Sequence, residues 1–303
     1  MKIQKSYQNN QDEGTLYIVP TPIGNLEDIT LRALRILEEA DIVLAEDTRN
    51  TGKLLHHFEL KKKMISYHEH NKIARAEQIL EMLENGESLA LVSDAGMPGI
   101  SDPGYDIIQQ AIEKEFSVVV LPGANAAISA LVGSGLPTDH FYFYGFLPRK
   151  KKDRDEAFSV LQSLTTTFIL YESPYRLQET IQQLSEVLGD RNVSVVRELT
   201  KRYEEYIRGS LQEVATWLNE HAIKGECCIV VEGMKVDTTT NWWQQLTLRE
   251  HVEKVIEQDE CSNKDAIKTV AKERKIPKRE VYNAYHIDDK KSVKRPNCPD
   301  KLK

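Results

Sequence analysis

The stretch TLYIVPTPIGNLEDITLRALRILEEADIVLA, residues 15–45, decides the fold. It begins with a short apolar run, Leu16–Val19, that predicts a buried strand. After a loop with two prolines comes a helical pattern over Leu31–Ala40, and Thr30 is placed to cap its first turn. A second apolar run at Ile42–Ala45 predicts the next strand. A strand, a helix and a further strand in this order are typical of an α/β fold.

The same alternation of short apolar runs and helical patterns continues as far as Glu232. Further strands are predicted at Lys63–Ser66, Leu89–Val92, Ser117–Leu121, Phe141–Tyr144, Thr167–Tyr171, Asn192–Val196, Glu205–Ile207 and Cys227–Val231. Strands separated by helices favour a mainly parallel sheet with helices on its faces. Because there are too many strands for one compact unit, we expect two α/β domains that meet near Pro122-Gly123.

Three helical patterns, Thr247–Gln258, Lys264–Lys272 and Pro277–His286, follow a linker at residues 234–240. The predicted fold class is therefore α/β, with two α/β domains and a small C-terminal all-helical domain. The expected boundaries are a disordered N-terminus at 1–13, an N-terminal α/β domain at 14–122, a C-terminal α/β domain at 123–234, a helical domain at 242–287 and a disordered tail at 288–303.

The net charge of −7 over 303 residues argues against a chain that coats nucleic acid indiscriminately. The charge is unevenly distributed, because residues 261–287 contain seven Lys or Arg and only three Asp or Glu. That stretch carries +4, so the remainder of the chain carries −11. We therefore expect an acidic body with a basic appendage.

Cysteine spacing and the lengths of the apolar runs exclude several other classes of protein. The four cysteines, Cys227, Cys228, Cys261 and Cys298, form no C-x-x-C pair, which argues against structural zinc and a disulfide framework. The first thirteen residues lack the apolar core of a secretory signal, and no apolar run reaches the ~20 residues of a membrane helix. We expect a cytoplasmic protein with reduced, inert thiols, no metal site and no membrane span.

Three loops that follow predicted strands stand out: PTPIGN at 20–25, EDTR at 46–49 and SDAGMPGISDPG at 93–104. Open α/β sheets bind ligands at the carboxyl ends of their strands, so three such loops together favour a binding site over simple turns. Neither G-x-x-x-x-G-K-[ST] nor G-x-G-x-x-G is present, which disfavours phosphate-cradling cofactors. Acidic loops suit a ligand with hydroxyls and positive charge; S-adenosylmethionine fits that description, and so do other amines.

The span Thr15–Gly233 resembles the tetrapyrrole-methylase superfamily, and more closely its ribosomal branch, the small-subunit rRNA 2′-O-methyltransferase I family. The segments that carry the resemblance are 16–51, YHEHN at 67–71, 91–104, 122–137, FYGFLPRK at 143–150, YESPYR at 171–176, VVRELTKRYEE at 195–205 and KGECCIVVEG at 224–233. The first loop departs from the tetrapyrrole-acting relatives, because PTPIGN stands where they have G-x-G-P-G-D. This departure disfavours a porphyrin-type substrate.

The resemblance implies a fold of the tetrapyrrole-methylase type, with S-adenosylmethionine held in a cleft between the two α/β domains. Transferred position by position, the cofactor-binding residues are Ile23, Asp94, Ala95, Gly96, Met97, Asn125, Ala126, Tyr171 and Glu226. Among them, Asp94 is the expected partner of the cofactor's polar groups.

A sulfonium methyl group is already activated, so the enzyme mainly aligns the reacting atoms, and a general base assists the ribose hydroxyl. Matching motifs offer Asp47, His68, Glu172 and Lys201 as catalytic candidates. Asp47 and Glu172 rank first because they sit at the ends of predicted strands. The alternatives are an ion pair of Asp47 with Arg49, and a helix-terminus contact of Glu172 beside Ser173. No third ligand accompanies His68 and His70, so we interpret YHEHN as a surface loop.

The basic C-terminal helices resemble a helix-turn-helix RNA-binding appendage, which the ribosomal family carries. The candidates for phosphate contacts there are Lys264, Lys268, Lys272 and Lys275. A second basic group, Arg149, Lys150, Lys151 and Lys152, is expected near the mouth of the cleft. The alternative is a solvated face that stabilises a small bundle, but the acidity of the remaining chain favours RNA contact.

The resemblance finally implies 2′-O-methylation of a cytidine in 16S rRNA of the 30S subunit, by a homodimer. Two alternatives stay open: methylation of a precorrin-type tetrapyrrole, and a non-catalytic RNA-binding protein of ribosome assembly. The altered first loop and the basic C-terminal helices both speak against the tetrapyrrole substrate.

Overall fold

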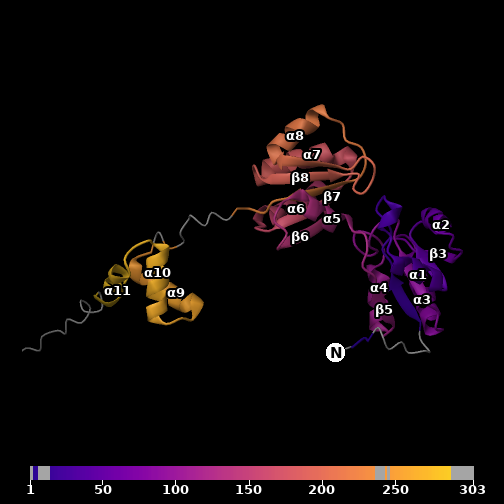
Figure 1. Cartoon of the computed structure of the whole chain (residues 1–303), viewed down its shortest axis with the longest axis horizontal. Helices are drawn as coiled ribbons and strands as arrows, with labels where there is room; N and C mark the ends of the chain where they lie inside the picture. Colours follow the sequence, from indigo (N-terminus) through magenta and orange to yellow (C-terminus); the bar gives the residue numbers. More distant parts are fainter. Residues whose placement is uncertain (1–2, 6–13, 236–242, 244–245, 288–303) are drawn as a thin grey trace, which may run out of the picture. The chain divides into compact units, whose positions relative to one another are not determined.

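The computed structural model describes residues 3–5, 14–235, 243 and 246–287. The chain falls into two compact units, Met1–Lys235 and Val236–Lys303, and each is considered by itself (Figure 1). The expected disordered tail and Cys298 lie outside the described residues, as do most of the expected disordered N-terminus and most of the linker. The first unit contains two sheets with helices, which confirms the α/β class; the domain boundary near residue 122 stays a prediction.

The first sheet is parallel, with the strand order β3-β2-β4-β1-β5. Its strands are β1 (Thr15–Ile18), β2 (Ile42–Ala45), β3 (Lys63–Ser66), β4 (Leu89–Val92) and β5 (Ser117–Val120). The connections contain η1 (Leu26–Asp28), α1 (Leu31–Glu39), α2 (Thr48–His57), α3 (Lys72–Glu84) and α4 (Tyr105–Glu113). The central strands β1, β2 and β4 are almost fully buried, as expected where helices cover both faces of a parallel sheet.

Alternate side chains of these strands pack into two separate cores. Leu16 of β1 lies in one core with Ile79 of α3. Val43 of β2 lies in the other core with Leu37 of α1. Each fully buried side chain of this size stabilises the fold by about 1.5–3 kcal/mol, so helices are held on both faces. The loops at the carboxyl edge of the sheet therefore project from a rigid support.

Helix α2 is an element that the sequence did not predict, because residues 46–49 were expected to form a loop. Asp47 instead caps the helix, and its Oδ1 accepts a hydrogen bond of 2.8 Å from the backbone N–H of Arg49. The helix contains Gly52, a poor helix former, and its buried residues are Thr51 and Leu55. Because only these two residues are buried, the sequence of α2 shows no clear helical period of apolar residues.

The second sheet is mostly antiparallel, with the strand order β6-β7-β10-β8-β9. Its strands are β6 (Phe141–Phe146), β7 (Thr167–Glu172), β8 (Asn192–Arg197), β9 (Glu205–Ser210) and β10 (Cys227–Val231). β6 and β7 pair in parallel, whereas β10 is antiparallel to β7 and β8, and β8 is antiparallel to β9. The expectation of a mainly parallel sheet is therefore wrong here. The β8–β9 connection at residues 198–204 has no crossover helix, so it returns the chain as a hairpin.

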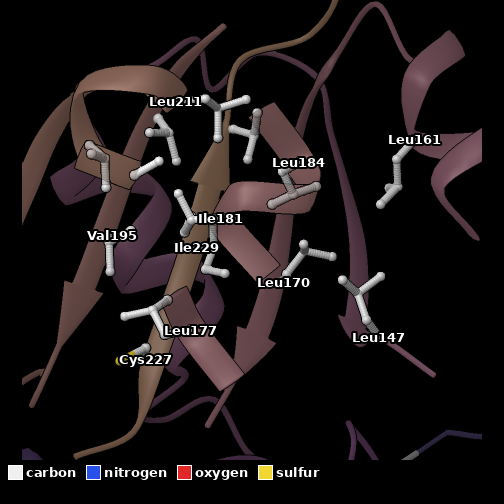
Figure 2. Close-up of a cluster of buried hydrophobic side chains, with 14 of the residues drawn as sticks. Leu147, Leu161, Leu170, Leu177, Ile181, Leu184, Val195, Leu211, Cys227 and Ile229 are labelled. Carbon is white, nitrogen blue, oxygen red and sulfur yellow. The ribbon is translucent and has the colours of Figure 1, made fainter. Parts of the chain in front are cut away.

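Four helices accompany this sheet: α5 (Ala126–Ser134), α6 (Lys151–Ser163), α7 (Pro174–Leu188) and α8 (Leu211–Glu220). On one face, Ile181 of α7 packs in a core with Val195 of β8 and Ile229 of β10 (Figure 2). On the other face, Leu131 of α5 packs in a core with Val230 of β10. The second sheet is thus also covered on both sides.

Neighbouring cysteines of β10 belong to these two different cores. Cys227 lies in the core of α6–α8 and Cys228 in the core of α5, and both thiols are free and buried. Burial raises the pKa of both thiols to about 12. The two groups are therefore protonated thiols at neutral pH, as expected for inert core cysteines.

Within residues 246–287, the second unit consists of three packed helices, α9 (Leu248–Asp259), α10 (Asn263–Glu273) and α11 (Lys278–Ile287). Thr247 and Glu250 form the predicted capping box at the start of α9. Val252, Val270 and Val281 are completely buried between the helices. A C-terminal helical region is thus confirmed. Among the described residues, no helix has the length and hydrophobicity that a membrane span requires.

Candidate functional site

Backbone hydrogen bonds join the first and third loops at the carboxyl edge of the first sheet. Thr21 N donates to Gly96 O and Gly96 N donates to Thr21 O, both at 2.9 Å. The Thr21 hydroxyl also donates to Ser93 O at 3.1 Å. Gly96 has φ +79°, and a β-carbon there would lie 3.3 Å from Ile23 Cγ2. This close approach of the two loops therefore requires glycine at residue 96.

Asp94 connects the third loop to the start of α2. Its Oδ1 accepts a hydrogen bond of 3.2 Å from Asp47 N, and its Oδ2 accepts one of 3.0 Å from Asn50 Nδ2. Asp94 N in turn donates to Glu46 Oε2 at 3.4 Å. All three loops that the sequence singled out thus converge at one edge of the sheet, with the Asp94 carboxylate held in a fixed position.

A pocket of about 440 Å³ opens between these loops and the second sheet. We call it the main pocket. It is lined by every residue that the family resemblance assigned to the cofactor, namely Ile23, Asp94, Ala95, Gly96, Met97, Asn125, Ala126, Tyr171 and Glu226. The volume lies within the range of about 300–1,000 Å³ for small-molecule sites. The structure therefore brings the nine candidates together, while their contact with a cofactor stays a prediction.

Tyr171 at the end of β7 forms a fixed wall of the main pocket. Its hydroxyl oxygen accepts a hydrogen bond of 3.2 Å from Ala127 N in the first turn of α5. The rings of Phe143 and Phe146 pack edge-on against it, at centroid distances of 5.1 and 5.5 Å. Burial raises the pKa of Tyr171, so the phenol stays neutral. The neighbouring Asn125 caps α5, with its Oδ1 accepting from Ile128 N at 3.0 Å.

The lining of the main pocket is strongly acidic. Six carboxylates and one lysine line it: Glu46, Asp94, Asp102, Glu172, Glu198, Glu226 and Lys201. Burial, reinforced by the charges of Glu46, Asp94 and Glu226, raises the pKa of Asp102 to about 7. Burial also raises the pKa of Glu46. Carboxylates that are crowded in this way favour a positively charged ligand, because a cation relieves their mutual repulsion.

Sequence reasoning did not assign Glu46, Asp102 or Glu198 to the site. The first two lie in the loops that it did single out, so position at a strand end was the available signal. Glu198 begins the β8–β9 connection and has φ +50°, a left-handed conformation that a residue with a side chain rarely adopts. Ser101, also in the pocket, has φ +60°. Backbone strain of this kind is common at functional sites. No sequence pattern predicted the left-handed conformation of these two residues.

Lys201 joins the β8–β9 connection to the first loop. Its Nζ lies 3.0 Å from Glu198 Oε1, and its side chain packs against Gly24. A β-carbon at Gly24 would lie 2.5 Å from Lys201 Cγ, so the lysine stem fills the space that the missing side chain leaves. Lys201 thus presents an ion-paired ammonium group to the main pocket.

The two first-ranked catalytic candidates, Asp47 and Glu172, have structural partners. Asp47 does not line the main pocket; its carboxylate pairs with Arg49 at 2.6 Å, and these hydrogen bonds hold the pKa of Asp47 far below its usual value. Glu172 lines the pocket, but Oε1 accepts from Ser173 N at 2.8 Å and Oε2 from Thr180 Oγ1 at 2.7 Å. Both placements match the alternatives that the sequence offered, an ion pair and a helix-terminus contact.

His68 and His70 lie outside the main pocket, with ring centroids 6.1 Å apart. Asn71 Oδ1 accepts from His68 N at 2.8 Å, so the segment forms a turn before α3. In the part of the chain that the structure describes, no group of three or more His, Cys, Asp or Glu side chains is arranged to hold a metal ion.

The basic RNA candidates are exposed side chains. Lys264, Lys268 and Lys272 recur every four residues along α10, so they form one stripe, and Lys275 follows in the turn. Charge within this unit is uneven, because residues 246–260 contain two Lys or Arg but five Asp or Glu. The cationic surface is therefore that of α10 and α11 rather than of the whole unit. Arg149, Lys150, Lys151 and Lys152 are exposed at the start of α6.

The sequence matches a known protein family and several named relatives. The family model of tetrapyrrole (corrin/porphyrin) methylases matches residues 15–215. Ribosomal RNA small subunit methyltransferase I of Halalkalibacterium halodurans is 52% identical over 94% of this chain and 99% of its own length. The protein of the same name from Bacillus subtilis is 50% identical over 95% of this chain and 99% of its length.

The fold also matches a solved structure of much lower identity. Uroporphyrin-III C-methyltransferase from Thermus thermophilus, complexed with S-adenosylhomocysteine, aligns with a TM-score of 0.52 and 18% identity. The alignment covers 72% of this chain and 97% of that one. The chain therefore belongs to the tetrapyrrole (corrin/porphyrin) methylase family and, within it, to the ribosomal RNA small subunit methyltransferase I group.

Proposed function

We propose that this protein transfers a methyl group from S-adenosylmethionine to ribosomal RNA of the small subunit. More specifically, we propose the 2′ hydroxyl of a cytidine ribose in 16S rRNA as the acceptor. Membership of the rRNA methyltransferase group supports the reaction class. The observation that carries the proposal is the main pocket, in which carboxylates from both sheets surround a cavity of about 440 Å³.

The residues of the main pocket suit S-adenosylmethionine chemically. The cofactor carries a sulfonium and an ammonium group, and carboxylates such as Asp94, Asp102 and Glu226 attract positive charge. Its adenine needs apolar surface, which Ile23 and Met97 offer. We propose that these five residues hold the cofactor, together with the backbone of residues 95–96 and 125–126 and the ring of Tyr171.

When bound, the cofactor supplies an activated methyl group, so the protein has to orient the acceptor and exclude water. Asp94 is fixed by donors from α2, and the packed rings of Tyr171 and Phe146 line the main pocket. We retain Lys201 as the proposed catalytic residue, because its ammonium group is in the pocket and is oriented by Glu198. A fixed cation there stabilises negative charge that develops on a ribose oxygen.

The C-terminal helices are proposed to bind the RNA. Lys264, Lys268, Lys272 and Lys275 are exposed, and none of them has a carboxylate partner within the described residues. Arg149 and Lys150 are proposed as a second phosphate contact. On the family resemblance alone, we also propose that the protein works in the cytoplasm as a homodimer.

The proposal is tested by incubating the protein with methyl-labelled S-adenosylmethionine and undermethylated 30S subunits. We expect label in 16S rRNA at a ribose 2′ oxygen, where the methyl group makes the adjacent phosphodiester bond resistant to alkaline cleavage. Replacing Lys201 by Met preserves the apolar stem, so we expect cofactor binding to persist while transfer slows by about 10²-fold. Label in an added porphyrinogen instead, or subunit binding without any transfer, contradicts the proposed reaction.

A further inference from the structure

A second cavity lies beside the main pocket and has no part in the function proposed so far. Its volume is about 380 Å³, and we call it the α2 cavity because Asn50, Lys53 and His57 of α2 line it. Pro22 of the first loop contributes to another wall. Asp94 lines both the α2 cavity and the main pocket, so the two are direct neighbours.

The two neighbouring cavities differ in charge. Lys53 and His57 are exposed, and neither has a carboxylate partner among the described residues, whereas Asp94 is the single carboxylate that lines the α2 cavity there. The surrounding segment, residues 48–63, contains five Lys or Arg and one Glu in a chain of net charge −7. RNA phosphates are repelled by the acidic main pocket and attracted to this segment.

The arrangement of side chains in the α2 cavity suits a nucleotide. Asn50, Leu54 and His57 follow one another at spacings of four and three residues, which places them on one face of α2. Asn50 donates to Asp94 through Nδ2, which leaves its carbonyl oxygen as a hydrogen-bond acceptor. Leu54 and Pro22 supply apolar surface, and Lys53 supplies a mobile cation. The cavity thus combines an apolar wall, an amide acceptor, the exposed Lys53 cation and the exposed imidazole of His57.

We infer that the α2 cavity receives the RNA nucleotide that accepts the methyl group, with Lys53 and His57 contacting its flanking phosphates. This inference rests on the proposed function and names the acceptor site for it. Methyl transfer requires the reacting atoms to lie about 3–3.5 Å apart, so the acceptor site has to adjoin the cofactor site. The α2 cavity satisfies this condition through Asp94, since that one residue lines both cavities.

The test compares the double variant Lys53→Gln/His57→Gln with the wild-type full-length chain. We expect the KM for 30S subunits and the Kd for a 16S rRNA fragment to rise by roughly tenfold, because phosphate contacts are lost. The kcat should stay within about twofold, since these contacts bind ground state and transition state alike. S-adenosylmethionine affinity, measured by calorimetry, should be unchanged. The slope of log affinity against log salt should also fall in magnitude.

A matched control removes the same two residue types elsewhere in the first unit. Lys114 and His140 are both exposed and lie outside the α2 cavity, so Lys114→Gln/His140→Gln should leave RNA affinity unchanged. A second variant, Leu54→Trp, fills the α2 cavity and should abolish RNA methylation while cofactor binding persists.

Two results overturn the inference: wild-type RNA affinity and KM in both α2-cavity variants, or a fall in cofactor affinity equal to the fall in RNA affinity. Failure of the proposed function is a separate result, because it appears in the wild-type protein as absence of label in rRNA. In that case, the RNA affinities of the wild-type protein and of the two α2-cavity variants still show whether the α2 cavity binds RNA.

Discussion

The main pocket and the C-terminal helices differ in charge and in how their functional side chains are held. In the main pocket, carboxylates sit on loops from two sheets and are fixed by specific hydrogen bonds, such as those to Asp94. On α10, lysines project from one face of a helix whose other face is buried through Ile267 and Val270. Binding in the main pocket therefore depends on the exact positions of the carboxylates. Binding on α10 requires only that the lysines are displayed on a stable helix.

This difference teaches that cofactor binding and RNA binding depend on separate parts of the chain. A small cation has to meet its carboxylates at hydrogen-bond distance, where burial strengthens the attraction. RNA phosphates are numerous and are attracted over longer distances, so the number of cations matters more than their placement. Substitutions in one region should therefore leave the binding function of the other intact.

The largest expected effect is on RNA binding, after replacement of all four lysines of the α10 stripe and its following turn by Gln. We expect affinity for 30S subunits to fall on the order of 100-fold at physiological salt, because four phosphate contacts are lost. The salt dependence of binding should weaken as well. Calorimetric affinity for S-adenosylmethionine should not change; a parallel loss there contradicts the separation of the two functions.

The next effect concerns Asp94. Asp94→Ala should weaken S-adenosylmethionine binding roughly tenfold to hundredfold in calorimetry, because a fixed charge-assisted contact is removed. Asp94→Asn keeps the shape and should show a smaller loss. The exposed Asp155 of α6 serves as a control, and Asp155→Ala should bind the cofactor normally. Unchanged affinity in the Asp94→Ala variant excludes a direct role of this carboxylate.

Asp102 should make cofactor binding depend on pH. Its pKa is raised from 3.8 to about 7, so the fold favours the neutral acid, and a cationic ligand has to displace the proton below pH 7. We expect affinity to fall about tenfold for each pH unit below 7 and to level off above it. In the cofactor-free protein, the protonated form of Asp102 stabilises the fold. This contribution to the free energy of unfolding is fully present below pH 3.8 and is lost as pH rises through about 7. Asp102→Asn should abolish this component of the pH dependence; an identical pH profile rules the assignment out.

The smallest effect on activity is expected from Arg274, which supports the helical unit from within. Its guanidinium donates to Leu246 O at 2.6 Å and Trp243 O at 2.8 Å, and its Nε to His251 Nδ1 at 3.1 Å. Arg274→Ala should destabilise this unit by about 2–3 kcal/mol, measured by hydrogen exchange of α9 and α10. Methylation at 25 °C should change by less than about twofold. A loss as large as that of the four-lysine variant shows that Arg274 itself contacts RNA.

Local signals explain why much of the fold was predictable. The strands at Leu89–Val92 and Cys227–Val231 are short, apolar and bounded by polar residues, and both occur as expected. Capping residues are equally local: Thr30 accepts from Ala33 N at 3.0 Å, as its position before an apolar period indicated. The convergence of three loops followed from topology, because parallel strands place their carboxyl ends at one edge.

Features that depend on long-range packing were not predictable. The antiparallel position of β10 between β7 and β8 is set by contacts between strands far apart in the chain. The presence of Asp102 and Glu198 in one pocket depends on how the two sheets' loops meet. Asp47 ranked high as a base because it follows a strand, but its partner Arg49 is decided by the helix that starts there.

The central claim is that the main pocket binds an adenosyl sulfonium ligand between carboxylates of the two sheets. A crystal structure of the full-length protein with S-adenosylhomocysteine tests it most directly. We expect the ligand within hydrogen-bond distance of Asp94 or Asp102, with its adenine against Ile23 and Met97. An empty main pocket with the ligand bound elsewhere, or a nucleoside triphosphate bound there in preference, contradicts the claim.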